Sequence, residues 1–395
     1  MLQNIDKTLL PSILDNDFYK FTMQCAVVKL FPDVKAKYQF INRGKHIFPK
    51  GFGDALRQSV DAMAQLKLTK DEKQYLIETC PYLNPAYIDF LAGYRYDPSE
   101  VTIHQDGHYL EVYVSGYWYR TILWEVPLLA LISELFYKYT YQERWPHDKV
   151  VDNTNQKTQL FNKLGVRYAE FGTRRRHSYK VHREVVEVLS KCNKKGFIGS
   201  SNVHMAMLYG VKPIGTHAHE WFMFHAARYG FKMSNAMGLE NWVEVYRGDL
   251  GVALSDTYTT EIFFKQFDKK FAKLFDGVRH DSGDPIEFAN KTIEHYENHG
   301  INPLYKFIIF SDALNPEKIK SITEATQDKI GISFGIGTNL TNDVGLDPMN
   351  IVIKLTDIMY DNSEWIPTVK LSDEPNKHTG NPNMIRLAKE LLNIY

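Results

Sequence analysis

Two histidines, His217 and His219, stand two residues apart in the segment 215–220, between a strand-like run at residues 211–214 and a helix-like run at residues 221–228. A neutral imidazole at a strand-to-helix junction can act as a general base, a metal ligand or a nucleophile. A nucleophilic histidine would accept a phosphoryl group and allow an energy-coupled reaction. The segment alone is equally consistent with two hydrogen-bonded structural histidines, so both interpretations stay open here.

A second group of candidate functional residues consists of acidic side chains. Residues 275–285 carry three aspartates, an arginine and a histidine within ten residues, a density that neither a core nor a simple turn explains. Carboxylates in such a segment can hold Mg²⁺ on a diphosphate or accept hydrogen bonds from ribose hydroxyls. Asp256 and Asp312 each follow another apolar run. Acids therefore recur where predicted strands end.

Candidate phosphate-binding residues follow other apolar runs. The three consecutive arginines at residues 174–176 can hold phosphate through bidentate donors, although a solvated run of charge is the ordinary alternative. Small residues at 199–202 would let backbone amides approach a ligand, although a plain helix N-cap is the ordinary alternative. The two glycines within 334–339 suit a phosphate cradle late in a barrel. Neither a Walker loop nor a G-x-G-x-x-G motif is present, so a nucleotide would be held in another way.

The elements that must position these residues alternate in type after residue 150. Short apolar runs, each followed by a turn and a helical run, lie at residues 166–171, 197–198, 211–214, 251–254, 277–278, 306–310, 330–334 and 351–355. Repeated βα units predict a parallel sheet, and seven or eight of them in ~220 residues favour a barrel-like closure. Loops at the carboxyl ends of barrel strands build active sites, so we expect the residues above to converge there.

The first third of the chain has a mixed pattern. An Asp-Gly pair inside an alternating run predicts a β-hairpin over residues 101–114. Pro127 is predicted to open an apolar helix that ends near residue 141, because proline is favoured at the first helical position. Further helices are predicted at residues 18–30, 50–66 and 69–79, and further strands at residues 34–41 and 122–126. We therefore predict an α/β protein with an N-terminal α/β domain at residues 1–140, a barrel domain at 141–375 and a C-terminal tail at 376–395 that packs back on the body.

Composition excludes several classes of partner. Lys plus Arg and Asp plus Glu balance at 47 each, so no global charge favours nucleic acid or an anionic membrane. The three cysteines form neither a zinc pattern nor a disulfide framework, which is typical of a reducing cytosol. Residues 1–7 lack a signal-peptide pattern, and the longest apolar stretch, residues 126–136, is too short to span a bilayer. We expect a cytoplasmic protein without nucleic-acid or membrane partners.

Several of these stretches together resemble the ATP-coupled nicotinate phosphoribosyltransferase family. The matching stretches occur in family order at residues 14–20, 169–175, 199–202, 215–220, 278–285, 311–312 and 334–338. The resemblance implies an irregular TIM-like α/β barrel joined to an N-terminal α+β sandwich, as in type II phosphoribosyltransferases. It implies that nicotinate and 5-phosphoribosyl 1-diphosphate form nicotinate mononucleotide and diphosphate for NAD biosynthesis, with ATP hydrolysis coupled through a phosphohistidine.

The resemblance also assigns residues to the base and to the phosphoryl group. His219, four residues after the glycine of G-T-x-x-H, is the one expected to be transiently phosphorylated, and His217 is a bystander. Phe171 resembles one face of the slot that stacks the pyridine ring. Tyr19 resembles the other face, which a neighbouring subunit supplies in related enzymes. Either the N-terminal domain folds over its own barrel or it reaches the barrel of a partner, and the resemblance favours a homodimer with composite sites. Ser201 stands where the nicotinamide-using relative has an aspartate; a serine can donate to a carboxylate that an acid would repel.

The remaining assignments concern the phosphates. Arg174 and the Gly335–Gly337 turn, with Thr338, resemble holders of the 5-phosphate, and Arg174 or Arg175 is also placed to read the nicotinate carboxylate. The residues expected around ribose, diphosphate and Mg²⁺ are Asp256, Arg279 and Asp281, with both aspartates in catalytic roles and Asp281 as the metal ligand. No tightly bound organic cofactor is expected beside Mg²⁺.

Three rivals remain at this stage. The nearest is the same chemistry with nicotinamide as the base. A sugar-phosphate aldolase or isomerase would need a Schiff-base lysine or a poised glutamate at a strand end, and Lys354 and Lys370 are the lysines placed for it. A nucleotide sensor that kept the fold would bind ligand without turnover.

Overall fold

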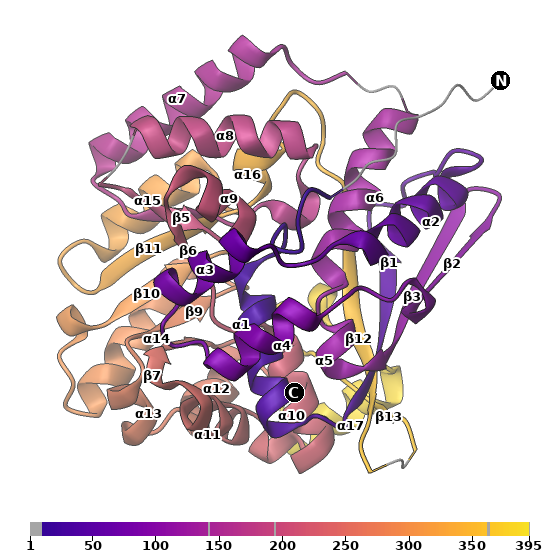
Figure 1. The fold of residues 1–395 in the computed structure, drawn as a ribbon. Helices are drawn as coiled ribbons and strands as arrows, with labels where there is room; N and C mark the ends of the chain where they lie inside the picture. The colour runs from indigo at the N-terminus through magenta and orange to yellow at the C-terminus, as the bar shows by residue number, and fades with distance from the viewer. Residues whose placement is uncertain (1–9, 141–142, 193–194, 362–363, 395) are drawn as a thin grey trace.

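The computed structural model describes residues 10–140, 143–192, 195–361 and 364–394. The prediction that residues 1–7 are not a signal peptide concerns residues outside these ranges. Two sheets organise the chain, a seven-stranded parallel sheet on the left of Figure 1 and a five-stranded antiparallel sheet on the right. No helix of the described ranges is both long and apolar enough to cross a bilayer.

The parallel sheet contains seven of the eight predicted βα strands in the order β6-β5-β4-β11-β10-β9-β8. Their bounds are β4 (Tyr168–Glu170), β5 (Phe197–Ser200), β6 (Lys212–Pro213), β8 (Val252–Leu254), β9 (Gly277–His280), β10 (Phe307–Phe310) and β11 (Gly331–Ile336). The sheet curls like a barrel, and helices cover its outside (Figure 1). The predicted α/β barrel class is confirmed, but β6 and β8 do not pair as strands, so the barrel is incomplete.

Helices connect these strands, and capping residues fix where several begin. Asp284 accepts hydrogen bonds from the backbone N–H groups of Ile286 and Glu287 and so starts α14, while Asn315 caps α15. Asp284 is therefore a cap within the aspartate-rich segment. The helices of this half are α7 (His147–Leu164), α8 (Tyr179–Cys192), α9 (Val203–Tyr209), α10 (His219–Tyr229), α11 (Ser234–Tyr246), α12 (Thr260–Gln266), α13 (Lys269–Leu274), α14 (Pro285–Asn298), α15 (Pro316–Thr326) and α16 (Thr338–Thr341).

The antiparallel sheet is built from both ends of the chain. Its strands are β1 (Lys35–Asn42), β2 (Val101–Asp106), β3 (Tyr109–Tyr117), β12 (Ile351–Met359) and β13 (Ile366–Pro367). The predicted hairpin is confirmed as β2–β3. The assignment of residues 351–355 to the barrel series is wrong, because β12 pairs antiparallel with β1. Its first residues alternate between buried and half-buried, as expected where one sheet face packs on a core and the other does not.

The helices of the N-terminal half are α1 (Phe18–Leu30), α2 (Phe52–Ala62), α3 (Lys70–Thr79), α4 (Pro85–Gly93), α5 (Trp118–Thr121) and α6 (Glu125–Tyr139). Of these, α2, α5 and α6 contact the antiparallel sheet. The predicted strand at residues 122–126 is wrong: residues 122–124 turn into α6, and Pro127 lies at its third position. These residues are buried, and a short apolar run does not distinguish a strand from a buried helical turn.

The segment before α1 docks on the end of the barrel. Asp17 forms an isolated β-bridge with Asn202, and the N–H of Phe18 donates to the carbonyl of Ser201 at 2.6 Å. Helix α1 then contacts both α5 and α11, and so links the two halves. At the other end, α17 (Pro382–Leu392) buries Ala388 and Leu392. The domain ranges given above remain a prediction.

Candidate active site

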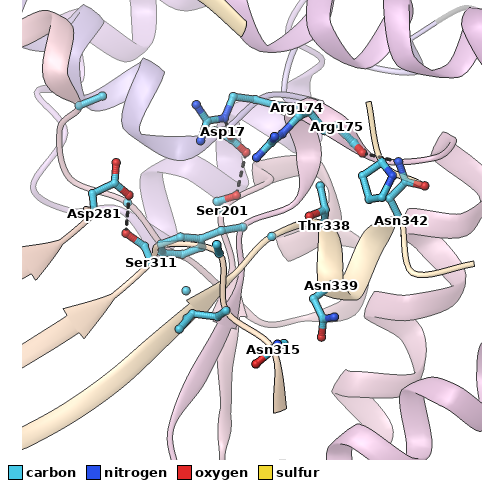
Figure 2. A pocket seen from close by; sticks show the side chains of 18 of the residues that line it. Asp17, Arg174, Arg175, Ser201, Asp281, Ser311, Asn315, Thr338, Asn339 and Asn342 are labelled. Atoms are coloured by element: carbon cyan, nitrogen blue, oxygen red, sulfur yellow. Dashed lines mark hydrogen bonds and ion pairs between the residues drawn. The ribbon is translucent and has the colours of Figure 1, made fainter. Parts of the chain in front are cut away.

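A cavity of about 460 Å³ opens where β4, β5, β9, β10 and β11 end. Figure 2 shows side chains from separate strand ends that surround it, among them Arg174, Asp281 and Thr338. Every predicted site residue except Asp256 lines this cavity: Tyr19, Phe171, Arg174, Arg175, Ser201, His219, Arg279, Asp281, Gly335, Gly337 and Thr338. The predicted convergence at the carboxyl ends of the strands is therefore what the structure shows.

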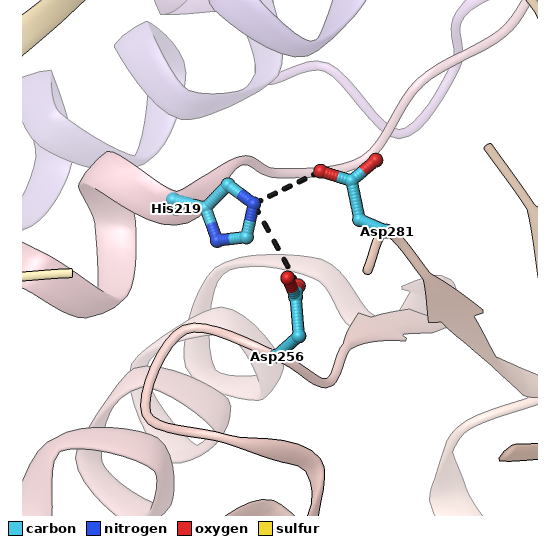
Figure 3. A group of neighbouring side chains, drawn as sticks. All are labelled: His219, Asp256 and Asp281. Atoms are coloured by element: carbon cyan, nitrogen blue, oxygen red, sulfur yellow. Dashed lines mark hydrogen bonds and ion pairs between the residues drawn. The ribbon is translucent and has the colours of Figure 1, made fainter. Parts of the chain in front are cut away.

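His219 is the first residue of α10 and is 8% exposed. Its Nδ1 lies 3.0 Å from Oγ1 of Thr257. Its Nε2 lies 3.0 Å from Oδ2 of Asp281 and 3.6 Å from Oδ1 of Asp256 (Figure 3). Nζ of Lys370 lies 2.9 Å from the same Nε2. Burial and the charge of Lys370 outweigh both carboxylates and lower the pKa of His219 to about 4. The imidazole is therefore neutral at pH 7 and keeps a lone pair on one ring nitrogen.

Two carboxylates flank this imidazole. Burial acts to raise the pKa of Asp256, but Lys370 and His219 lower it overall. Burial is likewise outweighed at Asp281, where the hydrogen bond with His219 and the charge of Arg279 hold the pKa well below its usual range. Both acids are therefore ionised at neutral pH.

The same three residues could hold a cation. His219, Asp256 and Asp281 place one ligand atom each within 4.8 Å of one another. Oδ1 of Asp256 is buried without a hydrogen-bond partner, so a carboxylate oxygen beside His219 has unused accepting capacity. Carboxylate oxygens are the protein ligands that Mg²⁺ prefers, so the pair of acids fits this ion.

His217 lies outside this cluster. Its Nε2 accepts a hydrogen bond from the backbone N–H of Leu254 at 3.1 Å, and its ring meets Trp242 edge-on with centroids 4.7 Å apart. It is fully buried, and burial lowers its pKa well below the usual value. Of the two interpretations of the histidine pair, a cavity position thus applies to His219 and a structural one to His217.

The three consecutive arginines, residues 174–176, occupy two different environments. Arg174 and Arg175 line the cavity, whereas Arg176 is 1% exposed and forms two hydrogen bonds to Asp15, at 2.7 and 2.8 Å. Arg174 lies 3.9 Å from Oδ2 of Asp17. Burial and the charge of Arg174 lower the pKa of Arg175 to about 10, which still leaves it charged. Two cationic side chains therefore face the ligand space.

Phe171 lies directly on the backbone of Gly335. A Cβ atom built at Gly335 would come within 2.3 Å of two Phe171 ring carbons. Gly335, predicted as a phosphate holder, thus makes room for an aromatic ring. The backbone of Tyr19 also lies close to Gly215, whose added Cβ would meet the Tyr19 nitrogen at 2.8 Å. Both aromatic residues line the cavity of one chain, as expected where the N-terminal domain folds over its own barrel, and the homodimer stays a prediction.

Ser201 is engaged differently from the expectation. Its hydroxyl donates to Oδ1 of Asp17 at 2.7 Å (Figure 2), so its proton is already committed. Asp17 lines the cavity, and burial raises its pKa. The sequence placed Asp17 in a matching stretch without giving it a role.

The lysines of the aldolase hypothesis are placed elsewhere. Nζ of Lys370 lies between His219 and Asp256, 3.7 Å from Oδ2 of the latter. Burial lowers the pKa of Lys354 to about 7, but Lys354 does not line the cavity. Sequence reasoning considered Lys370 only as a Schiff base and missed it as a partner of His219.

Comparison with known proteins assigns the family. The model of the Nicotinate phosphoribosyltransferase (NAPRTase) family matches residues 166–394, and that of the NAPRTase N-terminal domain matches residues 14–133. The chain belongs to this family. It is 60% identical over 385 residues to the nicotinate phosphoribosyltransferase of Chromohalobacter salexigens, covering 97% of this chain and 98% of the relative. It is 47% identical to that of Desulforapulum autotrophicum, covering 94% and 96%.

Solved NAPRTase structures agree with this assignment. The crystal structure of nicotinate phosphoribosyltransferase from Porphyromonas gingivalis superposes with a TM-score of 0.95 at 45% identity, covering 98% of this chain and 100% of that one. The enzyme from Vibrio cholerae gives 0.91 at 33% identity, covering 98% and 96%. The resemblance of the sequence to the NAPRTase family and the fold that it implied are both confirmed.

Proposed function

We propose that this member of the family joins nicotinate to 5-phosphoribosyl 1-diphosphate, giving nicotinate mononucleotide and diphosphate for NAD biosynthesis, and couples the reaction to ATP hydrolysis through transient phosphorylation of His219. The observation that carries the proposal is the state of His219. It is a neutral imidazole on the wall of a cavity, held at both ring nitrogens by Thr257 and Asp281.

The phosphoryl step requires a ring nitrogen that carries a lone pair, as one nitrogen of a neutral imidazole does, and positive charge nearby. A ring nitrogen of His219 attacks the γ-phosphorus of ATP, a nitrogen–phosphorus bond forms, the bond from that phosphorus to the β,γ-bridging oxygen breaks, and ADP leaves. Asp281 can take a hydrogen bond from Nε2 and thereby stabilise the phosphorylated imidazole. Water later releases the group as inorganic phosphate. Arg175 and Arg279, both on the cavity wall, supply charge for the phosphate oxygens.

The glycosyl step uses the same cavity. The pyridine nitrogen of nicotinate attacks C1 of the ribose while the bond from C1 to the diphosphate oxygen breaks. Phe171 and Tyr19 offer aromatic faces for the base. Asp281 and Asp256 would hold a Mg²⁺ ion, which when bound offsets the negative charge of the diphosphate.

Selectivity for nicotinate rests on the arginines. Because Ser201 donates to Asp17, we assign the carboxylate of nicotinate to Arg174 and Arg175, which both line the cavity. Losing a hydrogen bond to a charged group costs about 1.5–3 kcal/mol, which is roughly tenfold or more in affinity. Nicotinamide is therefore expected to be a poor substrate.

A steady-state assay with and without ATP tests this proposal. Nicotinate mononucleotide formation should accelerate with ATP, and ADP should appear in step with product. An unchanged rate without ATP would contradict the coupling, and equal kcat/KM for nicotinamide would contradict the selectivity. Ligand binding without turnover would instead support the sensor. A homodimer in the cytoplasm remains part of the proposal, with each chain building its own site.

A further inference from the structure

The two edge strands of the parallel sheet, β6 and β8, do not pair with each other, and the gap between them is the seam of the incomplete barrel. On the side away from this seam, β8 pairs with β9: the carbonyl of Gly251 accepts from Asp276 N–H at 2.8 Å, and Ser255 N–H donates to the carbonyl of Arg279 at 3.3 Å. Alternate residues of a strand direct their backbone groups to opposite sides. The N–H and C=O groups of Val252 and Leu254 therefore face the gap.

Side chains from the segment after β6 satisfy these groups. The hydroxyl of Thr216 donates to the carbonyl of Val252 at 3.1 Å, and Nε2 of His217 accepts from the N–H of Leu254 at 3.1 Å. The same segment pairs with β5 through its backbone, where Ile214 N–H donates to the carbonyl of Ser200 at 2.9 Å. The segment after β6 thus spans the seam: its backbone hydrogen-bonds to β5 on one side, and the Thr216 hydroxyl and the His217 imidazole hydrogen-bond to β8 on the other.

Both ends of this bridge lead directly to the reactive cluster. His217 stands two residues before His219. Leu254 immediately precedes the turn that carries Asp256 and Thr257, which contact the two ring nitrogens of His219. A change in the width of the seam would therefore move His219 relative to both of its partners.

We infer that His217 is a positioning residue, whose imidazole closes the barrel seam and sets the separation between His219 and the Asp256–Thr257 turn. The inference about rate rests on the proposed function; the closure of the seam does not. A simple space-filling role would need the ring volume alone. Positioning through the seam needs an unprotonated acceptor at the place of Nε2, because its partner is a backbone N–H.

Burial supports the assignment of an acceptor. His217 is fully buried, and its ring meets Phe222 and Trp242 edge-on with centroids 5.1 and 4.7 Å away. Without His217 the amide of Leu254 would be left unpaired in the seam, and unpaired buried backbone groups are costly.

Two substitutions separate positioning from space filling. His217→Gln keeps an acceptor at a similar reach, whereas His217→Leu keeps comparable volume without one. If the leucine variant does not fold, His217→Met replaces it, since methionine adapts to irregular space. The rate of hydrogen–deuterium exchange at the Leu254 amide measures whether the hydrogen bond across the seam is kept. The rate of nicotinate mononucleotide formation measures whether His219 and its partners are still correctly placed.

We expect the Leu254 amide to be protected in the wild type and in H217Q and to exchange at least tenfold faster in H217L. We expect H217L to lower kcat about tenfold, with KM for nicotinate little changed, because small displacements of reacting groups have large effects on rate. H217Q should retain most of the activity. Equal protection of Leu254 in all three proteins, or equal loss of kcat in both variants, would overturn the inference. If ATP does not change the rate of the wild-type enzyme, the proposed coupling is refuted, but the exchange result at Leu254 still tests the role of His217 in the seam.

Discussion

Substitution of Gly335 by alanine offers a direct test of the base slot. The added Cβ would lie 2.3 Å from two Phe171 ring carbons, whereas ordinary contact begins near 3.4 Å. The ring must therefore retreat by about 1 Å. Gly335 does not have a positive φ, so alanine brings no left-handed backbone strain and the effect falls on the ring. An aromatic stacking contact is worth about 0.5–1.5 kcal/mol, which is about 2- to 12-fold in affinity.

Steady-state kinetics with nicotinate varied should show KM for nicotinate raised by that factor, while KM for 5-phosphoribosyl 1-diphosphate changes less. A double-mutant cycle supplies the control. Once Phe171→Ala has removed the ring, Gly335→Ala has nothing to displace and should add no further loss. Additive effects of the two substitutions, or an unchanged KM for nicotinate in Gly335→Ala, would refute the placement of the ring.

Three further predictions concern charge and assembly. Lys370→Met removes the cation 2.9 Å from Nε2 of His219 and should raise the pKa of that imidazole, so the acid limb of the pH–rate profile should move to higher pH; an unmoved limb would contradict the role of Lys370. Arg176→Ala leaves Asp15 as an unpaired buried charge and should lower the free energy of unfolding by about 3–5 kcal/mol, as denaturant titration would measure; a change below 1 kcal/mol would be inconsistent with the buried pair. Mixed Tyr19→Ala and His219→Ala chains should recover no activity after verified subunit exchange, since both residues serve the cavity of one chain; partial recovery would restore the composite site.

Much of the site could be predicted because its residues follow predicted strands. The carboxyl ends of parallel strands meet at one edge of a sheet, so the order of the βα units predicts that His219, Arg174 and Asp281 lie close together. The same logic could not separate Arg175 from Arg176, because adjacent residues point to different sides and only the docked N-terminal segment buries Arg176 against Asp15.

The remaining differences depend on tertiary contacts. β12 left the barrel series because it pairs with β1, a partner more than 300 residues earlier in the chain that no local pattern reveals. In the sequence, Lys354 is the one polar residue of the run 351–355; the alternation of half-buried and buried residues is seen only in the structure. Tyr19 was assigned to a partner subunit by resemblance alone; within this chain, the bridge between Asp17 and Asn202 holds the segment before α1 on its own barrel, a long-range contact that no local pattern indicates.

Localisation of the phosphoryl group after incubation with ATP tests the central claim most directly. Phosphohistidine is labile in acid, so the protein should be digested at neutral or alkaline pH and the phosphopeptide sequenced by mass spectrometry. We predict a single phosphoryl group on His219 in the wild type and in H217Q, and none in His219→Asn. Phosphate on His217, or no phosphoenzyme while ATP still accelerates nicotinate mononucleotide formation, would contradict the proposed coupling.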